Sequence, residues 1–119
     1  MTDCLFCKMV AGEIKPDVVY EDDDVLAFRD VNPQAPVHVL VIPKGEYVSQ
    51  DDFSREAPAE LIAGFWRAVG TVARELGLVE GGYRLLANTG ADAHQEVPHF
   101  HVHIFGGKDL GRMIKPPEK

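Results

Sequence analysis

The sequence predicts a single α+β domain, in which an antiparallel sheet of five strands is covered on one face by one long helix. Of the 119 residues, 45% are hydrophobic and 26% are charged, as in a globular protein with one core. Five short runs of β-branched and aromatic residues are joined mostly by short turns, and one longer stretch has apolar residues at helical spacing. Short turns favour antiparallel neighbours, so we expect one α+β domain over residues 1–119.

The first half of the chain should supply a short helix and three strands. Residues 5–14, LFCKMVAGEI, are typical of a short helix that ends near Gly12. DDD at 22–24 separates VVYE from VLAFR, which predicts a tight hairpin with solvated carboxylates rather than a metal site. VHVLVIP is almost continuously apolar, so it predicts a strand that is buried on both faces and ends at Pro43. His38 is the only polar side chain in that run.

The second half should supply the long helix and two more strands. Apolar residues recur at helical spacing between Pro58 and Leu76, with Glu60 in the first turn and Gly77 as the expected C-cap. YRLLAN then predicts a strand, TGADAHQEV a polar loop and HFHVHIF the last strand. Residues 114–119, IKPPEK, are expected to form a flexible tail.

The charge of the chain limits its partners. Twelve Lys and Arg against 19 Asp and Glu give a net charge of −7. This balance argues against binding to nucleic acid or to an anionic membrane, because both depend on basic side chains that neutralise phosphates. A small phosphorylated ligand needs only a local pocket of hydrogen-bond donors, so the net negative charge does not exclude it. The start of the chain, MTDCLFCKMV, lacks the features of a secretory signal, so we expect a cytoplasmic location.

The chain has two cysteines, Cys4 and Cys7. In a reducing cytoplasm we expect them to stay thiols and not to form a structural disulfide. A thioredoxin-like redox pair would need a strand before the first cysteine, and only three residues precede Cys4.

Three of the five histidines, His99, His101 and His103, alternate with apolar residues in PHFHVHIFGG. Because side chains alternate between the faces of a strand, these imidazoles should point to one face. At roughly 3.3 Å per residue, the outer two backbones lie about 13 Å apart. A zinc ion holds its nitrogen ligands at about 2.0 to 2.1 Å. A row of this length suits an extended anion such as phosphate better than one metal ion.

The HFHVHIF segment also resembles the histidine triad (HIT) family, whose pattern is His-x-His-x-His-x-x with apolar x. The rest of the chain is similar to the Hint branch of that family, the nucleoside phosphoramidate hydrolases. This similarity runs from CLFCKMVAGEI through YEDDDVLAFRDVNPQAPVHVLVIPK and GYRLLANTGADAHQEVPHFHVHIFGG to DLG. It implies the HIT fold, with a short N-terminal helix besides the long one, and a homodimer in which two five-stranded sheets join into a ten-stranded sheet.

The resemblance implies a catalytic role for four histidines. His101 would be the nucleophile that attacks the α-phosphorus and carries a covalent nucleotidyl group. His103 and His38 would donate to the phosphate oxygens and relay a proton to the leaving group. His99 would help to orient the site. No catalytic metal is implied.

The resemblance also implies a site for a purine nucleotide such as AMP or GMP. Asp30 would hold the ribose hydroxyls, although it could simply cap a turn. The backbone of Gln95, Glu96 and Val97 would contact the phosphate, with Asn88 close by. The apolar purine slot would consist of Leu5, Phe6, Met9, Phe28 and Val31, which could instead be ordinary core residues.

Two positions depart from the pattern of the family. Glu96 stands where some Hint proteins have a hydroxyl residue that hydrogen-bonds the phosphate or the leaving group, and a carboxylate cannot donate unless it is protonated. His94 stands where other members have Gly, and we expect it to lie at the rim of the pocket.

A structural zinc ion is a further implication of the resemblance. Some bacterial-type relatives bind zinc through two cysteines and two histidines. Cys4, Cys7 and His99 match three of these ligands, and Glu46 takes the place of the fourth. The alternative is a pair of free thiols and a solvated Glu46.

The function implied is hydrolysis of purine nucleoside 5′-phosphoramidates and related nucleotidyl conjugates through a nucleotidyl-histidine intermediate. The alternatives are a nucleotide-binding or partner-binding adaptor with incidental hydrolysis, a dinucleoside polyphosphate hydrolase, and a metal enzyme that uses the histidine row directly.

Overall fold

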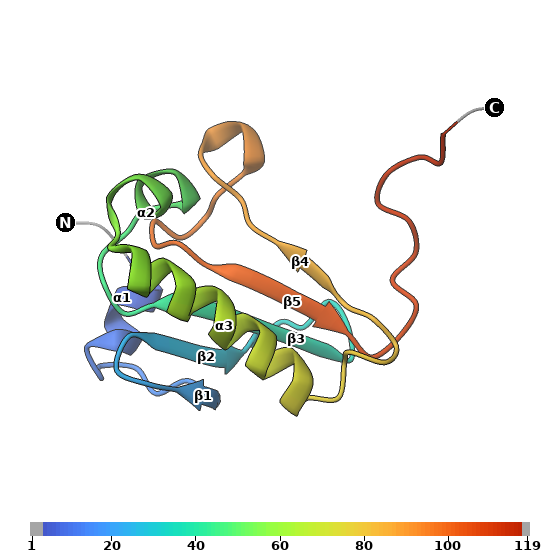
Figure 1. Ribbon diagram of the computed structural model, residues 1–119, viewed down its shortest axis with the longest axis horizontal. Helices are drawn as coiled ribbons and strands as arrows, with labels where there is room; N and C mark the ends of the chain where they lie inside the picture. Colours follow the sequence, from blue (N-terminus) through green and yellow to red (C-terminus); the bar gives the residue numbers. More distant parts are fainter. Residues whose placement is uncertain (1–3, 118–119) are drawn as a thin grey trace.

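The computed structural model describes residues 4–117 and contains a five-stranded antiparallel sheet with the order β1-β2-β3-β5-β4 (Figure 1). This confirms the predicted α+β fold. The strands are β1 (Val18–Glu21), β2 (Val25–Arg29), β3 (Val37–Pro43), β4 (Arg84–Leu86) and β5 (Val102–Gly106).

The long helix is α3 (Ala59–Glu75), and the short N-terminal helix is α1 (Leu5–Val10). Both were expected from the sequence. A further helix, α2 (Gln50–Glu56), was not predicted. Its start has a capping box, in which the side chain of Ser49 accepts from the backbone of the first turn and Asp52 accepts the Ser49 N–H. The sequence signal was therefore present, but a seven-residue helix is too short to show a clear apolar period.

Alternating residues of the sheet pack into two separate apolar clusters. On one face, Val39, Val41 and Ile104 pack with buried residues of α3, which lies across this face in Figure 1. On the other face, Phe28 and Leu40 belong to a smaller cluster that includes α1. Since α1 covers only part of this second face, the sheet has room there for a ligand site.

β3 is the central strand and pairs with β2 on one side and β5 on the other. Six of its seven residues are buried, which confirms the prediction from its continuous apolar run. Its register puts His38 opposite Phe105 and Leu40 opposite His103. The one polar residue of the strand therefore lies beside the histidine segment.

The last strand begins later than predicted. We expected it to include HFHVHIF from His99, but β5 begins at Val102. His99 and His101 lie in irregular backbone before the strand, so the alternation of strand side chains does not fix their directions. The prediction that the three histidines share one face is wrong for this reason.

The hairpin between β1 and β2 matches its prediction. Asp22 Oδ1 accepts the backbone N–H groups of Asp24 and Val25, both at 2.8 Å, so this carboxylate closes the turn. The predicted tail begins at Ile114, which is 80% exposed, and its residues 118–119 lie outside the described residues. No helix within residues 4–117 is long and apolar enough to cross a membrane.

Candidate functional site

A cavity of about 920 Å³ opens on the face of the sheet opposite α3. Phe28 of β2, His38 and Leu40 of β3, and His103 of β5 reach it because they alternate with the residues that face α3. His101 also lines it, from the segment that leads into β5. Three of the four histidines expected at the site therefore share one cavity.

The His101 side chain is held by the backbone just before it. His101 Nδ1 lies 2.7 Å from the carbonyl oxygen of His99, which can only accept, so Nδ1 carries the proton and donates it. In this tautomer Nε2 is unprotonated. The ring also packs edge-on against Phe6, with centroids 4.9 Å apart, and the residue is 7% exposed. His101 thus has a lone pair available in a cavity that largely shields it from water.

His38 and His103 form a directed hydrogen-bond pair. The backbone N–H of Gln34 donates to His38 Nδ1 at 3.1 Å, so the proton of His38 is on Nε2. His38 Nε2 then donates to His103 Nδ1 at 2.9 Å, which leaves the proton of His103 on Nε2. The pair presents an N–H donor beside His101, whose ring centroid is 5.2 Å from that of His103.

Burial keeps these imidazoles neutral. It lowers the pKa of His38 and His101, and it lowers the pKa of His103 to about 4 with help from its two histidine neighbours. The negative charge of Asp30 opposes the shift at all three. Asp30 Oδ2 lies 3.4 Å from His38 Nε2. A neutral His101 is the form that can act as a nucleophile.

Phe105 is a site residue that was not predicted from the sequence. The centroid of its ring lies 4.3 Å from the ring centroid of His38 and 5.5 Å from that of His103. The rings of Phe105 and His103 are nearly parallel. Alternation along β5 could have revealed it, because Phe105 follows His103 by two residues and must share its face. Phe105 restricts the orientation of both rings.

Most of the residues predicted to bind a nucleotide line this cavity. They are Leu5, Phe6, Met9, Phe28, Asp30, Val31, Asn88, Glu96 and Val97. Asp30 also caps a turn, as the alternative interpretation proposed, because its Oδ1 accepts the N–H of Asn32 at 2.8 Å. Since its Oδ2 faces His38, the two interpretations are compatible.

Gln95 lies in the predicted phosphate loop but is not among the residues that line the cavity. Its side chain holds the loop together instead. Gln95 Oε1 accepts the Gly90 N–H at 3.0 Å, and Nε2 donates to the carbonyls of Val48 and Val97. These bonds join the loop before β5 to the segment before α2. Gln95 therefore stabilises the cavity wall without lining the cavity itself.

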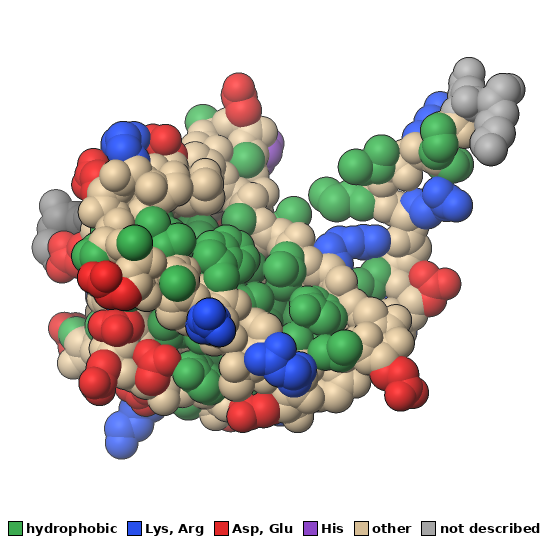
Figure 2. Space-filling model, viewed as in Figure 1, with side chains coloured by type: hydrophobic (Ala, Val, Ile, Leu, Met, Phe, Trp, Pro, Cys, Tyr) green, Lys and Arg blue, Asp and Glu red, His purple; other side chains and the backbone are tan. Residues whose placement is uncertain are grey.

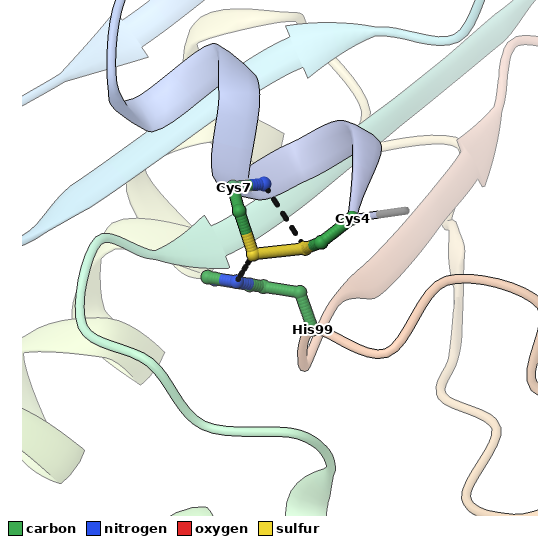
Figure 3. A group of neighbouring side chains, drawn as sticks. All are labelled: Cys4, Cys7 and His99. Carbon is green, nitrogen blue, oxygen red and sulfur yellow. Dashed lines mark hydrogen bonds between the residues drawn. A yellow bond between two sulfur atoms is a disulfide. The ribbon is translucent and has the colours of Figure 1, made fainter. Parts of the chain in front are cut away.

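Cys4 and Cys7 form a disulfide, which contradicts the expectation of free thiols (Figure 3). They flank the first turn of α1, and their Cα atoms are 5.1 Å apart, within the usual 4.4–6.8 Å range of disulfides. Cys4 Sγ also accepts the Cys7 N–H at the N-cap of the helix. The expectation relied on the redox state of the compartment, whereas the helix turn brings the two sulfurs together.

His99 points away from the cavity, toward this cysteine pair (Figure 3). Its Nε2 lies 2.7 Å from the carbonyl oxygen of Pro43 and therefore donates, which leaves Nδ1 unprotonated at 3.5 Å from Cys7 Sγ. One ligand atom from each of Cys4, Cys7 and His99 lies within 4.8 Å of the others. These three donors fit a metal ion once the disulfide is reduced, and Glu46 is outside the group.

A model of the HIT domain family matches residues 11–110. The chain belongs to the HIT family. A purine nucleoside phosphoramidase from Escherichia coli K12 is 40% identical over 112 residues, which cover 94% of this chain and 93% of that protein. An uncharacterized HIT-like protein from Azospirillum brasilense is 56% identical over 110 residues, covering 92% of this chain and 90% of the other.

Solved structures of HIT proteins have the same fold. A HIT family hydrolase from Clostridium thermocellum superposes with a TM-score of 0.87 at 41% identity, covering 97% of this chain and 99% of that one. A histidine triad protein from Clostridium difficile has a TM-score of 0.84 at 42% identity, with coverage of 96% and 98%. The similarity extends over nearly the whole chain, including the histidine segment.

The buried histidines predict a loss of stability in mild acid. His38, His99, His101 and His103 have folded-state pKa values below their usual 6.5, so the unfolded chain takes up protons first. Their contribution to the free energy of unfolding is fully present above about pH 6.5 and is lost as the pH falls, down to about 4 for His103. Urea unfolding followed by tryptophan fluorescence at a series of pH values measures this slope.

His103→Asn removes one of these groups. The slope of the free energy of unfolding against pH should then decrease between about pH 6.5 and 4, by at most about 1.4 kcal/mol per pH unit. An identical slope in the variant and the wild type would contradict the lowered pKa of His103 in the folded protein.

Proposed function

We propose that this HIT protein is a hydrolase that cleaves the P–N bond of purine nucleoside 5′-phosphoramidates and related nucleotidyl conjugates. The observation that carries the proposal is the tautomer of His101, whose unprotonated Nε2 belongs to a ring that lines the cavity beside the donor pair of His38 and His103. The name of the E. coli relative supports the same reaction.

In the first step, His101 Nε2 attacks the α-phosphorus, and the P–N bond to the leaving amine breaks. The product is a nucleotidyl-histidine whose ring carries a positive charge. His101 Nδ1–H donates to the carbonyl of His99, and this contact stabilises the charged ring. In the second step, water attacks the phosphorus and returns a proton to His103, the P–N bond to His101 breaks, and the nucleoside monophosphate leaves.

The leaving amine needs a proton, and His103 is placed to give it. Its Nε2–H is the free end of the hydrogen-bond chain from Gln34 through His38. The pKa of His103 is low in the free protein, but a bound phosphate brings negative charge next to it and raises that pKa again. Substrate binding would thus charge the group that protonates the leaving amine.

The other end of the cavity suits a nucleoside. Phe6 and Phe28 pack edge to face with centroids 5.4 Å apart and provide an apolar wall for a purine base. Asp30, between this wall and the histidines, can accept hydrogen bonds from ribose hydroxyls.

The rival functions differ in what they require. A metal enzyme would need the nitrogens of His38 and His103, which lie with Asp30 in a group that could hold an ion, but these nitrogens hydrogen-bond each other. An adaptor would need the cavity but not the nucleophile. A dinucleoside polyphosphate hydrolase would need the cavity to accept a second nucleotide.

Cytoplasmic location and the absence of nucleic-acid binding stay predictions.

We also propose that Cys4, Cys7 and His99 hold a structural zinc ion when the cysteines are reduced. The support is the donor set, with two sulfurs and an unprotonated Nδ1 held in place by the bond from His99 to Pro43. A bound zinc would cross-link α1 to the segment before β5. Glu46 lies outside this group of three donors, and it is the candidate for a fourth ligand only because it stands at the sequence position of the fourth ligand in zinc-binding relatives.

We propose in addition that the protein is a homodimer that joins its two sheets. β4 is an edge strand, and Leu85 on it is 42% exposed. Trp66 of α3 and Tyr83 are 43% and 38% exposed. Figure 2 shows hydrophobic side chains gathered over α3 and the neighbouring sheet edge, which is the surface that a second copy would cover.

His101→Ala should lower the single-turnover rate on adenosine 5′-phosphoramidate by roughly a thousandfold or more, because the nucleophile is lost. EDTA should leave the wild-type rate unchanged. A rate that survives in His101→Ala, or that needs added metal, would contradict the mechanism. Diadenosine polyphosphates are tested alongside, and faster turnover of these substrates would indicate a dinucleoside polyphosphate hydrolase instead.

AMP binding serves as the control for this variant. Calorimetry should show that His101→Ala still binds AMP, because the apolar wall and Asp30 are intact. A wild-type protein that binds AMP without turning over any of these substrates would support the adaptor function instead.

Reduced protein purified without a chelator or a histidine tag should contain about one zinc per chain. Cys7→Ser should lose the metal and melt at a lower temperature, because the cross-link to His99 is gone. Glu46→Gln tests the fourth position. If the wild-type protein holds only a small fraction of an equivalent, the zinc proposal is wrong.

Size-exclusion chromatography with light scattering should give twice the mass of the 13.1 kDa chain. Leu85→Arg should shift the protein toward the monomer by placing a charge in the contact. Val18→Arg is the matched control, since Val18 is 44% exposed and lies on β1 at the other edge of the sheet. A wild-type monomer, or equal effects of both variants, would overturn the proposed interface.

A further inference from the structure

His94 has a backbone conformation that side chains usually avoid. Its φ and ψ are 59° and 44°, the left-handed helical region, and within residues 4–117 it is the one non-glycine residue with a positive φ. Glycine adopts this region without steric cost, whereas residues with a side chain do not. An imidazole at a position that favours glycine needs a reason, and such outliers cluster at functional sites.

The conformation is imposed by the loop and not by the His94 side chain. The backbone N–H of His94 donates to the carbonyl of Ala91, and that of Gln95 donates to the carbonyl of Gly90. The Gln95 side chain then ties the loop to Gly90 and to Val48. In the part of the chain that the structure describes, the imidazole of His94 makes no hydrogen bond and no ion pair, so the ring does not hold the loop together.

The His94 side chain is exposed and lines the same cavity as His101 and His103. It belongs to the loop that follows the edge strand β4 and projects from the sheet in Figure 1. Phe28, on the apolar wall of the cavity, belongs to β2, which lies beyond β3 in the strand order, whereas the loop follows β4 at the opposite edge. The loop and the apolar wall are therefore on different sides of the catalytic histidines.

We propose that His94 is a specificity residue that donates a hydrogen bond to the leaving group of the substrate. The proposal rests on the proposed phosphoramidate hydrolysis. With the purine on the apolar wall and the phosphorus at His101, the leaving amine projects toward the loop that carries His94. The preferred leaving groups are amines that bear a carbonyl acceptor next to the reacting nitrogen.

The chemistry of the loop favours a neutral acceptor over an anionic one. An imidazole always has at least one N–H donor, whichever nitrogen carries the proton. Glu96, two residues further on, is exposed and lines the same cavity. Its carboxylate repels a second phosphate or a carboxylate on the leaving group. A carboxamide can accept from His94 and donate to Glu96, so it satisfies both side chains.

The test uses two adenosine 5′-phosphoramidates whose leaving amines are nearly the same size. One carries glycinamide, with a carbonyl acceptor, and the other carries isobutylamine, which is apolar. The wild type should have the higher kcat/KM on the glycinamide substrate. In His94→Gly this preference should fall by about 3- to 10-fold, the value of one lost hydrogen bond. His94→Asn, which tolerates the same backbone and keeps a donor, should recover part of the preference.

Two further measurements separate this role from a structural one. His94→Gly should not melt at a lower temperature than the wild type, because glycine relieves the backbone strain. Asp92→Asn, on the same loop but outside the cavity lining, should keep the wild-type preference. An unchanged preference in His94→Gly, or an equal loss on both substrates, would overturn the proposal. A wild type that hydrolyses neither substrate would instead overturn the proposed function on which it rests.

Discussion

The site depends on the hydrogen bond between His38 and His103, and therefore on the register in which β3 pairs with β5. Pairing of Leu40 with His103 and of His38 with Phe105 brings the two imidazoles to 2.9 Å on one face of the sheet. A shift of one residue would turn His103 toward α3 and put Ile104 in the cavity. The apolar residues that pack under α3 fix the register, so the core of the protein also positions its chemistry.

Burial does two things at this site. It removes the histidines from water, which lowers their pKa values and leaves His101 neutral. It also makes their hydrogen bonds obligatory, because a buried polar group without a partner is costly. Each buried ring has an assigned partner, namely the carbonyl of His99 for His101, the backbone N–H of Gln34 for His38, and the carbonyl of Pro43 for His99. Tautomers set by the backbone are therefore part of the fold.

Much of the site could be predicted from residue patterns. The single polar residue in a buried strand identified His38, and its placement beside the histidine segment is confirmed. The resemblance to the HIT family identified the apolar and acidic residues that line the cavity, although their roles stay predictions. Phe105 could have been found by the same alternation that found His103. Gln34 could not, because it acts through its backbone N–H, which every residue except proline has.

The sequence by itself determined the order and type of the main elements, since apolar periodicity reports local geometry that each segment has on its own. It also predicted a histidine site for a phosphorylated ligand, and this stays a prediction. Only the tertiary structure decided which histidines belong to that site. His99 turned toward Cys4 and Cys7 because the chain enters β5 at Val102, and the start of a strand depends on its partner strand as well as on its own residues. The left-handed backbone of His94 was likewise decided by hydrogen bonds from elsewhere in the loop, which no local pattern reveals.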